Sequence, residues 1–238
     1  MKKKELDPRL ALLYEMAPPC KLAVDVGADH GFLICALVEG GKAERGIATE
    51  IHIRPLEKAR REAEGRGLGD KIKFCLTDGL EGIGPAELGA VVIAGMGGET
   101  ILHILESWAY RETPGIVYLL QPMTKAERLR QWLWDNGFAI RREECCTAAG
   151  RVYTVLEVIY TGEVTSHPAW ECCLGKVDPG KDADSRRYAE DLVRELKKIA
   201  AGLEQTGEAQ DRARAGELRE SAAIISGKIN GGDNSDVF

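Results

Sequence analysis

Residues 22–30, with the sequence LAVDVGADH, constrain the fold of this chain more than any other stretch. A run of apolar and β-branched residues leads into Asp25, Gly27 and Asp29, and residues 31–38 then have the pattern of a helix. This order predicts a strand, a tight turn and a helix. In an open α/β sheet such turns lie at the carboxyl ends of strands, where glycine lets the backbone approach a ligand and the next helix offers free N–H groups.

The acidic residues of this turn indicate the charge of the ligand. The G-x-G-x-x-G spacing of dinucleotide sites is missing, because Ala28 and Asp29 follow Gly27. Two carboxylates, Asp25 and Asp29, would also repel a pyrophosphate, whereas they could balance the sulfonium and ammonium cations of S-adenosylmethionine. A methyltransferase-type site is therefore the first hypothesis, and a solvated turn with an Asp cap is the alternative.

Strand-like and helix-like segments alternate after this turn. Further strands are predicted over residues 45–50, 71–76, 88–94 and 116–120, with helices over 55–66, 99–108 and 125–136. A helix over 6–16 comes first, with Asp7 as its N-cap and Pro8 as its first residue. The runs 138–145 and 152–160 have no helix between them and predict an antiparallel hairpin. The expected fold class is α/β, a class I (Rossmann-like) methyltransferase with a seven-stranded, mostly parallel sheet.

The composition changes after Thr161. We expect a methyltransferase domain over residues 1–161, a connector over 162–184, a helical coiled-coil hairpin over 185–230 and a disordered tail over 231–238. The hairpin is predicted because Leu196 and Ile225 belong to two apolar series at helical spacing, which are separated by the stretch from Gly202 to Gly216.

Charge and composition limit the classes of partner. The net charge of −6 argues against indiscriminate binding to nucleic acid, although local groups such as Arg9 or Lys125 with Arg128 and Arg130 could hold phosphates. No apolar run is long enough for a membrane span or a signal peptide, so we expect a cytoplasmic protein. The seven cysteines lack metal-site spacing, which predicts reduced thiols and no metal. No obligate protein partner is expected.

Polar residues follow four of the predicted strands and should meet at one edge of the sheet. Glu50 ends the second strand, where an acid can accept both ribose hydroxyls, and Asp78 could take the amino group of an adenine. The predicted cofactor-binding residues are Asp25, Gly27, Asp29, His30, Glu50, Asp78, Gly79, Ala94, Gly95 and Met96.

Five motifs resemble one family. They are Asp-Val-Gly-Ala-Asp-His at 25–30, Asp-Gly-Leu at 78–80, Ile-Ala-Gly-Met-Gly-Gly at 93–98, Leu-Gln-Pro at 120–122 and Leu-Arg-x-Trp-Leu at 129–133. Together they resemble the bacterial tRNA adenine-22 N1-methyltransferases, the TrmK family, over residues 6–160 and more weakly in the C-terminal hairpin. The resemblance implies that S-adenosylmethionine is the cofactor and that N1 of adenine 22 in tRNA is methylated. The chain departs from the family at Ala28, where Ser is common, and at Met123, where Asn is common. The change at Met123 could alter the substrate pocket.

The loop at residues 95–98 bears on the mechanism. It lacks the Asn- or Asp-Pro-Pro-aromatic run that is typical of methyltransferases acting on exocyclic amino groups. Ring N1 of adenine already carries a lone pair and needs no deprotonation, which suits a bare glycine loop. Positive charge then develops on the ring, and Asp29 is the candidate catalytic residue that would stabilise it.

A folded RNA must expose the target base to such a site. The candidate substrate-binding residues are Arg9, Gly97, Gly98, Gln121 and Pro122. Two alternatives stay open: a methyltransferase acting on another RNA base or on a small molecule, and a non-catalytic RNA-binding protein on the same fold.

Overall fold

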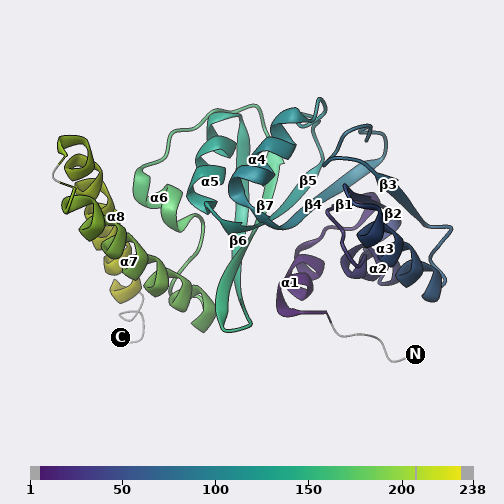
Figure 1. The fold of residues 1–238 in the computed structure, drawn as a ribbon, viewed down its shortest axis with the longest axis horizontal. Helices are drawn as coiled ribbons and strands as arrows, with labels where there is room; N and C mark the ends of the chain where they lie inside the picture. Colours follow the sequence, from purple (N-terminus) through teal and green to yellow (C-terminus); the bar gives the residue numbers. More distant parts are fainter. Residues whose placement is uncertain (1–5, 207, 232–238) are drawn as a thin grey trace, which may run out of the picture.

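A seven-stranded sheet forms the centre of the molecule (Figure 1). The computed structural model describes residues 6–206 and 208–231. The strand order is β3-β2-β1-β4-β5-β7-β6, and the pairs among β1 to β5 are parallel, whereas β7 runs antiparallel to both β5 and β6. The strands are β1 (Cys20–Val26), β2 (Ala43–Glu50), β3 (Ile72–Leu76), β4 (Leu88–Gly97), β5 (Val117–Thr124), β6 (Phe138–Ala148) and β7 (Arg151–Tyr160). The predicted α/β fold with a closing antiparallel hairpin is confirmed.

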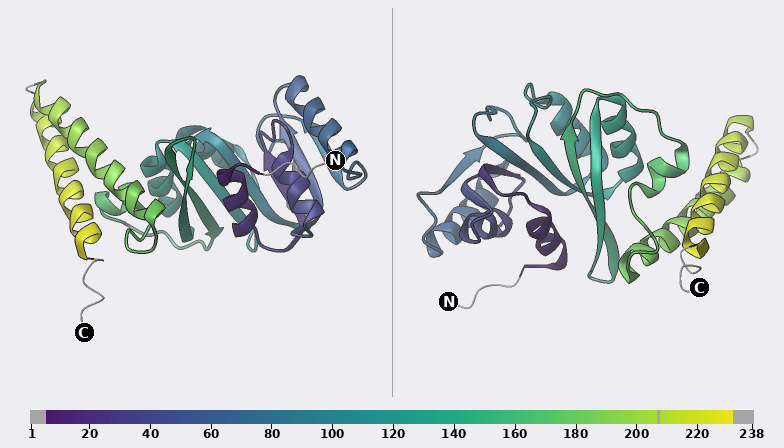
Figure 2. Two further views of the ribbon diagram at one scale, coloured as in Figure 1. Left: turned by 90° about the horizontal axis from the view of Figure 1, so that it is seen from below. Right: turned by 180° about the vertical axis from the view of Figure 1, so that it is seen from behind.

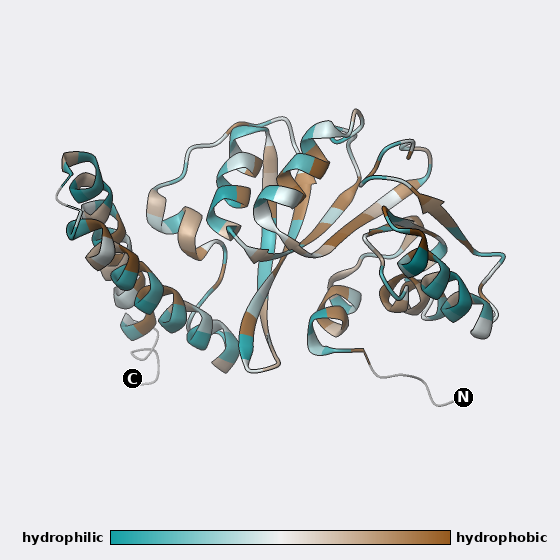
Figure 3. Cartoon of the chain, in the orientation of Figure 1, coloured by the Kyte–Doolittle hydropathy of each residue, from teal (hydrophilic) through white to brown (hydrophobic). Residues whose placement is uncertain are grey.

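Five helices cover this sheet. They are α1 (Pro8–Met16), α2 (Phe32–Glu39), α3 (Ile53–Gly65), α4 (Gly98–Ser107) and α5 (Ala126–Asp135). Ile34 of α2 packs with Val92 on one face of the sheet, and Ile101 of α4 packs with Val91 on the other. Adjacent residues of β4 thus serve opposite faces, as the two-residue repeat of a strand requires. In Figure 3 the brown, apolar segments accordingly gather along the strands.

The parallel strands β1, β2, β4 and β5 end at the same edge of the sheet, and the turns that follow them carry the predicted site. β4 and β5 extend further than the sequence predicts, so that Gly97 and Gln121 lie within strands. Two register shifts between β4 and β5 occur around Met96, which marks where the regular ladder breaks down.

The C-terminal region begins with a helix that the sequence analysis misses. Helix α6 (Ala169–Leu174) lies inside the predicted connector and has only 6 residues, too few to show an apolar repeat. Helices α7 (Ala183–Glu204) and α8 (Ala209–Gly231) then form the predicted hairpin, which projects from the side of the sheet (Figure 2).

The break within this hairpin is shorter than expected. Gly202 lies inside α7 and Gly216 inside α8, both on exposed positions, where a glycine costs about 1 kcal/mol relative to alanine but does not end a helix that packs well. Leu196 of α7 and Ile225 of α8 belong to the apolar cluster that joins the two helices. Of the predicted tail, residues 232–238 lie outside the described residues.

A buried ion pair connects the hairpin region to the sheet. Arg130 of α5 and Glu143 of β6 have fully buried side chains, and Arg130 Nη2 lies 2.5 Å from Glu143 Oε1. Arg130 Nη1 also donates to the carbonyl oxygens of Cys172 and Cys173 in α6, at 2.9 and 2.7 Å, and Nη2 donates to the hydroxyl of Tyr188 in α7 at 3.0 Å. The guanidinium of Arg130, which belongs to α5, thus bonds to three other elements: β6, α6 and α7.

Candidate functional site

The turn after β1 is held against two other strand ends. Gly27 has a φ of 67°, a conformation that favours glycine, and a Cβ added there would lie 2.4 Å from Met96 Cε, so the turn packs closely against the side chain of Met96 on β4. The Gly27 N–H donates to the Thr49 carbonyl oxygen at 2.9 Å. The β1 turn therefore contacts the ends of both β2 and β4, as the sequence analysis expects.

Asp25 lies deeper than the sequence predicts. The expectation that its carboxylate faces an open ligand edge differs from the structure, in which the residue is 5% exposed and accepts a hydrogen bond from the Ile34 N–H in the first turn of α2. Burial raises the pKa of Asp25 to about 7, and the hydrogen bond from Ile34 opposes this rise. The alternation of residues along β1 places Asp25 on the face of the sheet that α2 covers. The apolar residues around Asp25 in the sequence do not distinguish this buried position from one at the open edge.

Glu50 and its neighbours form the end of β2. Glu50 Oε1 accepts hydrogen bonds from the N–H groups of Ile51 at 3.0 Å and His52 at 3.2 Å, which aims the carboxylate across the strand end. Ile51 is 56% exposed beside it. An exposed, large apolar side chain at a polar edge is typical of a site that binds a flat aromatic ring. Ile51 is not among the predicted site residues, because it follows the strand outside any periodic pattern.

Thr49 ties the second and third strand ends together. Its side chain is fully buried, and Oγ1 donates to the carbonyl oxygen of Gly79 at 2.8 Å. The Thr77 N–H donates to the Glu50 carbonyl oxygen at 3.0 Å, so the turn that carries Asp78 is fixed beside Glu50. Thr49 is a second residue that sequence analysis misses, because a threonine inside a β-strand is common.

Acidic side chains without lysine or arginine partners among the described residues gather along this edge. Asp29 is exposed, has a φ of 40° and lies 3.5 Å from His30 Nε2, while the His30 ring stacks on Phe32 with ring centroids 5.2 Å apart. Within residues 6–206 and 208–231, no lysine or arginine lies within ion-pair distance of Asp29, Glu50 or Asp78. Such a group of carboxylates favours a cationic ligand.

The glycine loop that ends β4 is held in an open conformation. Gly95 has a φ of 74°, and a Cβ added there would meet no atom within 4 Å, so the backbone borders free space. The Gly95 N–H donates to Gln121 Oε1 at 3.1 Å, and Gln121 Nε2 donates to the Pro122 carbonyl oxygen at 3.1 Å. Gln121 is 1% exposed, so its amide holds the glycine loop in place and has no polar atom turned toward a substrate.

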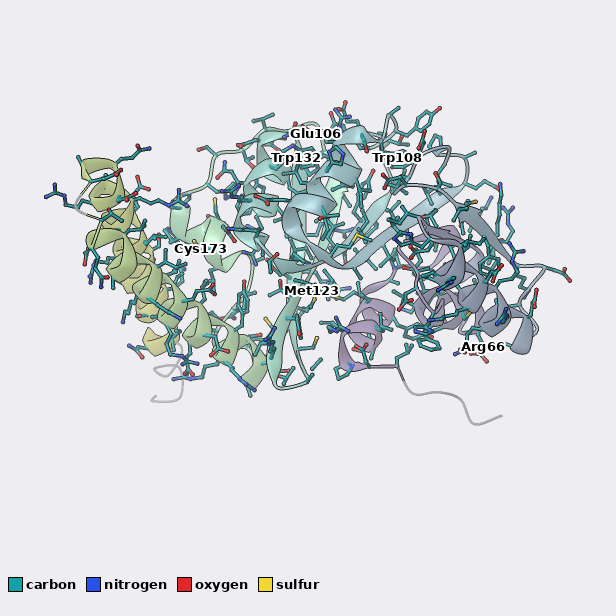
Figure 4. All side chains as sticks on the ribbon, viewed as in Figure 1. Arg66, Glu106, Trp108, Met123, Trp132 and Cys173 are labelled. Carbon is teal, nitrogen blue, oxygen red and sulfur yellow. The ribbon has the colours of Figure 1, made fainter. Side chains whose placement is uncertain are left out.

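The basic groups behave differently from the sequence prediction. The prediction that Arg130 holds phosphates is wrong, because its side chain is fully buried and paired with Glu143. Arg128 is exposed and lies 2.5 Å from Glu99, which leaves Lys125 as the open cation of that group. Arg9 remains half-buried at the carboxyl edge, where its Nη1 lies 3.6 Å from Met123 Sδ. Figure 4 labels Met123 in this region, next to α1.

A cavity of about 600 Å³ adjoins the site at one end. Asp78 and Gly79 line it together with His103, Trp108 and Tyr110, which come from α4 and the segment after it. It shares only the third strand end with the predicted cofactor residues. Within the described part of the chain no group of three or more His, Cys, Asp and Glu side chains could hold a metal ion, and all seven cysteines are free.

Comparison with known proteins decides the family. Residues 6–156 match the family model described as a methyltransferase domain. This chain belongs to that methyltransferase family. A curated Bacillus subtilis relative, the tRNA (adenine(22)-N(1))-methyltransferase, is 37% identical over 156 residues, which are 66% of this chain and 66% of that protein's length. The chain thus spans just under two thirds of this curated relative.

Solved structures of the family resemble the whole fold. The B. subtilis m1A22 tRNA methyltransferase TrmK has a TM-score of 0.82 and 28% identity, with 94% of this chain and 99% of that chain covered. The Streptococcus pneumoniae protein Sp1610 in complex with S-adenosyl-L-methionine has a TM-score of 0.75 and 28% identity, covering 91% and 97%. The resemblance to the TrmK family predicted from the motifs is confirmed. The match to nearly the full length of both structures includes the helical hairpin.

The residues of the site fit the cofactor of this methyltransferase family. The carboxylates of Asp29, Glu50 and Asp78 lack cationic partners among the described residues and are followed along the edge by the free backbone of Gly95. S-adenosylmethionine carries a sulfonium, an ammonium, two ribose hydroxyls and an adenine, and each finds a complementary group in this set. Asp25 is buried and accepts a hydrogen bond from the first turn of α2, so it supports the turn from below.

None of the helices in the described residues has both the length and the apolar content needed to cross a membrane.

Proposed function

We propose that this chain transfers the methyl group of S-adenosylmethionine to N1 of adenine 22 in tRNA. The observation that carries the proposal is the set of Asp29, Glu50 and Asp78, which have no lysine or arginine partner among the described residues, next to the bare glycine loop at residues 95–98. The names of the TrmK relatives, which act on adenine 22 of tRNA, support the choice of substrate. A tRNA substrate also supports a cytoplasmic location.

Each carboxylate has a separate part in this proposal. Glu50 would accept the ribose hydroxyls, with Ile51 against the adenine, and Asp78 would accept the amino group of that adenine. When bound, the cofactor supplies an electrophilic methyl group on a sulfonium. The remaining task of the protein is to align the acceptor ring and to balance charge, which positioned residues achieve without proton transfer.

Asp29 is the proposed catalytic residue. It lies in the β1 turn with a φ of 40°, and its side chain is exposed at the edge where the target base must enter. As the methyl group arrives at N1, the ring becomes cationic, and the carboxylate of Asp29 would stabilise the exocyclic amino group. Binding of the base would shield this pair from water, which strengthens the interaction.

The decisive experiment uses labelled S-adenosylmethionine and unmodified bulk tRNA, followed by digestion and nucleoside analysis. We expect label in 1-methyladenosine, and its loss when adenine 22 of a responsive tRNA is replaced by guanine. Label in another nucleoside would favour a different RNA base as the target. Cofactor binding by calorimetry without transfer to any tRNA would favour a small-molecule acceptor or a non-catalytic RNA-binding protein.

A further inference from the structure

Three side chains from distant parts of the chain meet beside the glycine loop. The guanidinium carbon of Arg9, on α1, lies 5.3 Å from the ring centroid of Tyr153, on β7. Arg9 Nη1 lies 3.6 Å from Sδ of Met123, at the end of β5. Arg9 Nη2 lies 3.2 Å from Oδ2 of Asp7. The guanidinium is therefore held between a ring, a thioether and a carboxylate.

The reversed direction of β7 brings Tyr153 to this place. Leu120 of β5 pairs with Leu156 of β7, and Met123 and Tyr153 each lie three residues beyond this pair toward the carboxyl edge, where both contact Arg9. Gln121 links this pair to the reaction site, because its Nε2 lies 3.6 Å from Met123 Sδ while its Oε1 accepts the Gly95 N–H. A chain of contacts through Met123 and Gln121 thus links the Arg9 guanidinium to the glycine loop.

The chemistry of this cluster suits a phosphate diester. A guanidinium that packs over an aromatic ring can still turn N–H groups toward phosphate oxygens, and Nη1 of Arg9 donates to the thioether of Met123, a weak acceptor that a phosphate oxygen can replace. Asp7 is partly committed elsewhere, since its Oδ1 accepts the N–H groups of Arg9 and Leu10 as the N-cap of α1. The side chain of Arg9 is 28% exposed and Met123 is 38% exposed, so the guanidinium can be reached from solvent.

We propose that Tyr153 is a positioning residue that holds the Arg9 guanidinium at the carboxyl edge, where Arg9 binds a phosphate of the nucleotide that is methylated. This inference rests on the proposed function. Tyr153 then acts on RNA binding through Arg9 and makes no contribution to cofactor binding. The aromatic ring is the part that matters, because a ring without the hydroxyl offers the same face to a guanidinium.

The test is a double-mutant cycle on full-length protein. Binding of unmodified tRNA is measured by fluorescence anisotropy without cofactor over a range of salt concentrations, and KM and kcat are measured alongside. We expect Arg9→Ala and Tyr153→Leu each to weaken tRNA binding about tenfold, as loss of a charge-assisted hydrogen bond predicts. Arg9→Ala should also reduce the slope of log affinity against log salt by about 1. Tyr153→Phe should bind like the wild type.

The combination of the two changes is decisive. In the Arg9→Ala background, Tyr153→Leu should have no further effect on tRNA affinity, because Tyr153 has lost the group that it positions. Additive effects would overturn the inference, since they would show that Tyr153 contacts RNA itself. Wild-type affinity in both single variants would overturn it as well.

Two controls separate this inference from other failures. Tyr14→Leu removes the ring of another cation–π pair, with Lys42 just before the start of β2 at the opposite edge of the sheet, and it should leave tRNA binding unchanged. Cofactor affinity by calorimetry and the thermal midpoint should match the wild type in every variant, and a changed cofactor affinity in Tyr153→Leu would contradict the assigned role. Absence of methylated adenine with the wild-type protein would reject the proposed function instead, and the binding cycle would still decide the role of Tyr153.

Discussion

The carboxylate of Asp25, at the end of β1, accepts a hydrogen bond from the backbone N–H of Ile34, in the first turn of α2. This bond joins the strand and the helix on either side of the turn that carries Gly27 and Asp29. Because Asp25 is 5% exposed, its ionised form is costly in the folded protein.

The first prediction concerns the pH dependence of stability. The pKa of Asp25 is raised from 3.8 to about 7 in the folded state, so between these values the folded protein binds more protons than the unfolded chain. The folded state is therefore progressively destabilised as the pH rises from about 4 to 7. Asp25→Asn removes this penalty, so the variant should gain about 3 kcal/mol more stability relative to the wild type at pH 8 than at pH 5.

Denaturant unfolding at both pH values measures this effect. Asp29→Asn is the matched control, because it removes an exposed carboxylate from the same turn. A difference between Asp25→Asn and the wild type that is the same at pH 5 and pH 8 would contradict the prediction.

The second prediction concerns cofactor binding by Glu50. Glu50→Ala removes the carboxylate and should weaken S-adenosylmethionine binding by about one to two decades. This change is equivalent to roughly 1.5–3 kcal/mol, the value of a charge-assisted hydrogen bond. Calorimetry with the cofactor measures the change. Glu57→Ala, which removes an exposed carboxylate from the nearby α3, should bind like the wild type. Equal affinities for all three proteins would remove Glu50 from the site.

The third prediction separates binding from catalysis at Asp29. Asp29→Asn should lower kcat much more than it lowers cofactor affinity, because the charge that Asp29 stabilises appears only during methyl transfer. Single-turnover kinetics with saturating tRNA and cofactor isolates this step. A wild-type rate in the variant would show that Asp29 only shapes the β1 turn.

The fourth prediction concerns the buried pair of Arg130 and Glu143. Arg130→Met should cost about 3–5 kcal/mol of unfolding free energy, because it leaves Glu143 buried without a partner. Adding Glu143→Leu should recover part of this loss. Full recovery is not expected, since the carbonyl oxygens of Cys172 and Cys173 also lose their donor. A double variant as unstable as Arg130→Met alone would show that the unpaired carboxylate is not the source of the loss.

The fifth prediction concerns the helical hairpin. Lys197 and Lys198 are exposed on α7 and have no acidic partner among the described residues. Replacing both with Ala should raise KM for tRNA and flatten its salt dependence while leaving cofactor affinity unchanged. Lys21→Ala, at the amino end of β1, is the control. An unchanged salt dependence would favour a protein partner for the hairpin.

The structure also changes how this hairpin should be tested. Removal of all residues after Thr161 would delete the hairpin together with α6. However, α6 supplies the carbonyl oxygens that bind Arg130, and His167 stacks on Trp134 with ring centroids 3.8 Å apart. A cut at Thr161 would expose both groups, so point substitutions on α7 are the cleaner experiment.

Local patterns account for most of what the sequence predicts. The turn at residues 25–30, the cap of α1 at Asp7 and the acids at the ends of β2 and β3 are each visible within a few residues. Glu50 and Asp78 therefore lie at the predicted edge, although their roles toward the cofactor stay predictions.

Long-range contacts account for what the sequence does not predict. Arg130 follows Lys125 and Arg128 and has the pattern of an exposed basic helix face, yet its burial depends on Glu143 and on carbonyl groups about 40 residues further along the chain. Tyr153 is placed by the register between β5 and β7, which no local pattern specifies. Such positions follow only from the packed tertiary structure.

The bonds from Arg130 to α6 and α7 have a consequence for how a large substrate is chosen. These bonds attach the base of the hairpin to the sheet, and α7 alone extends for about 33 Å with its 22 residues at 1.5 Å each. An RNA that touches both the outer end of the hairpin and the carboxyl edge must present its adenine at a set spacing. The protein would then select its target by the distance between two points of a folded RNA rather than by the identity of the bases between them.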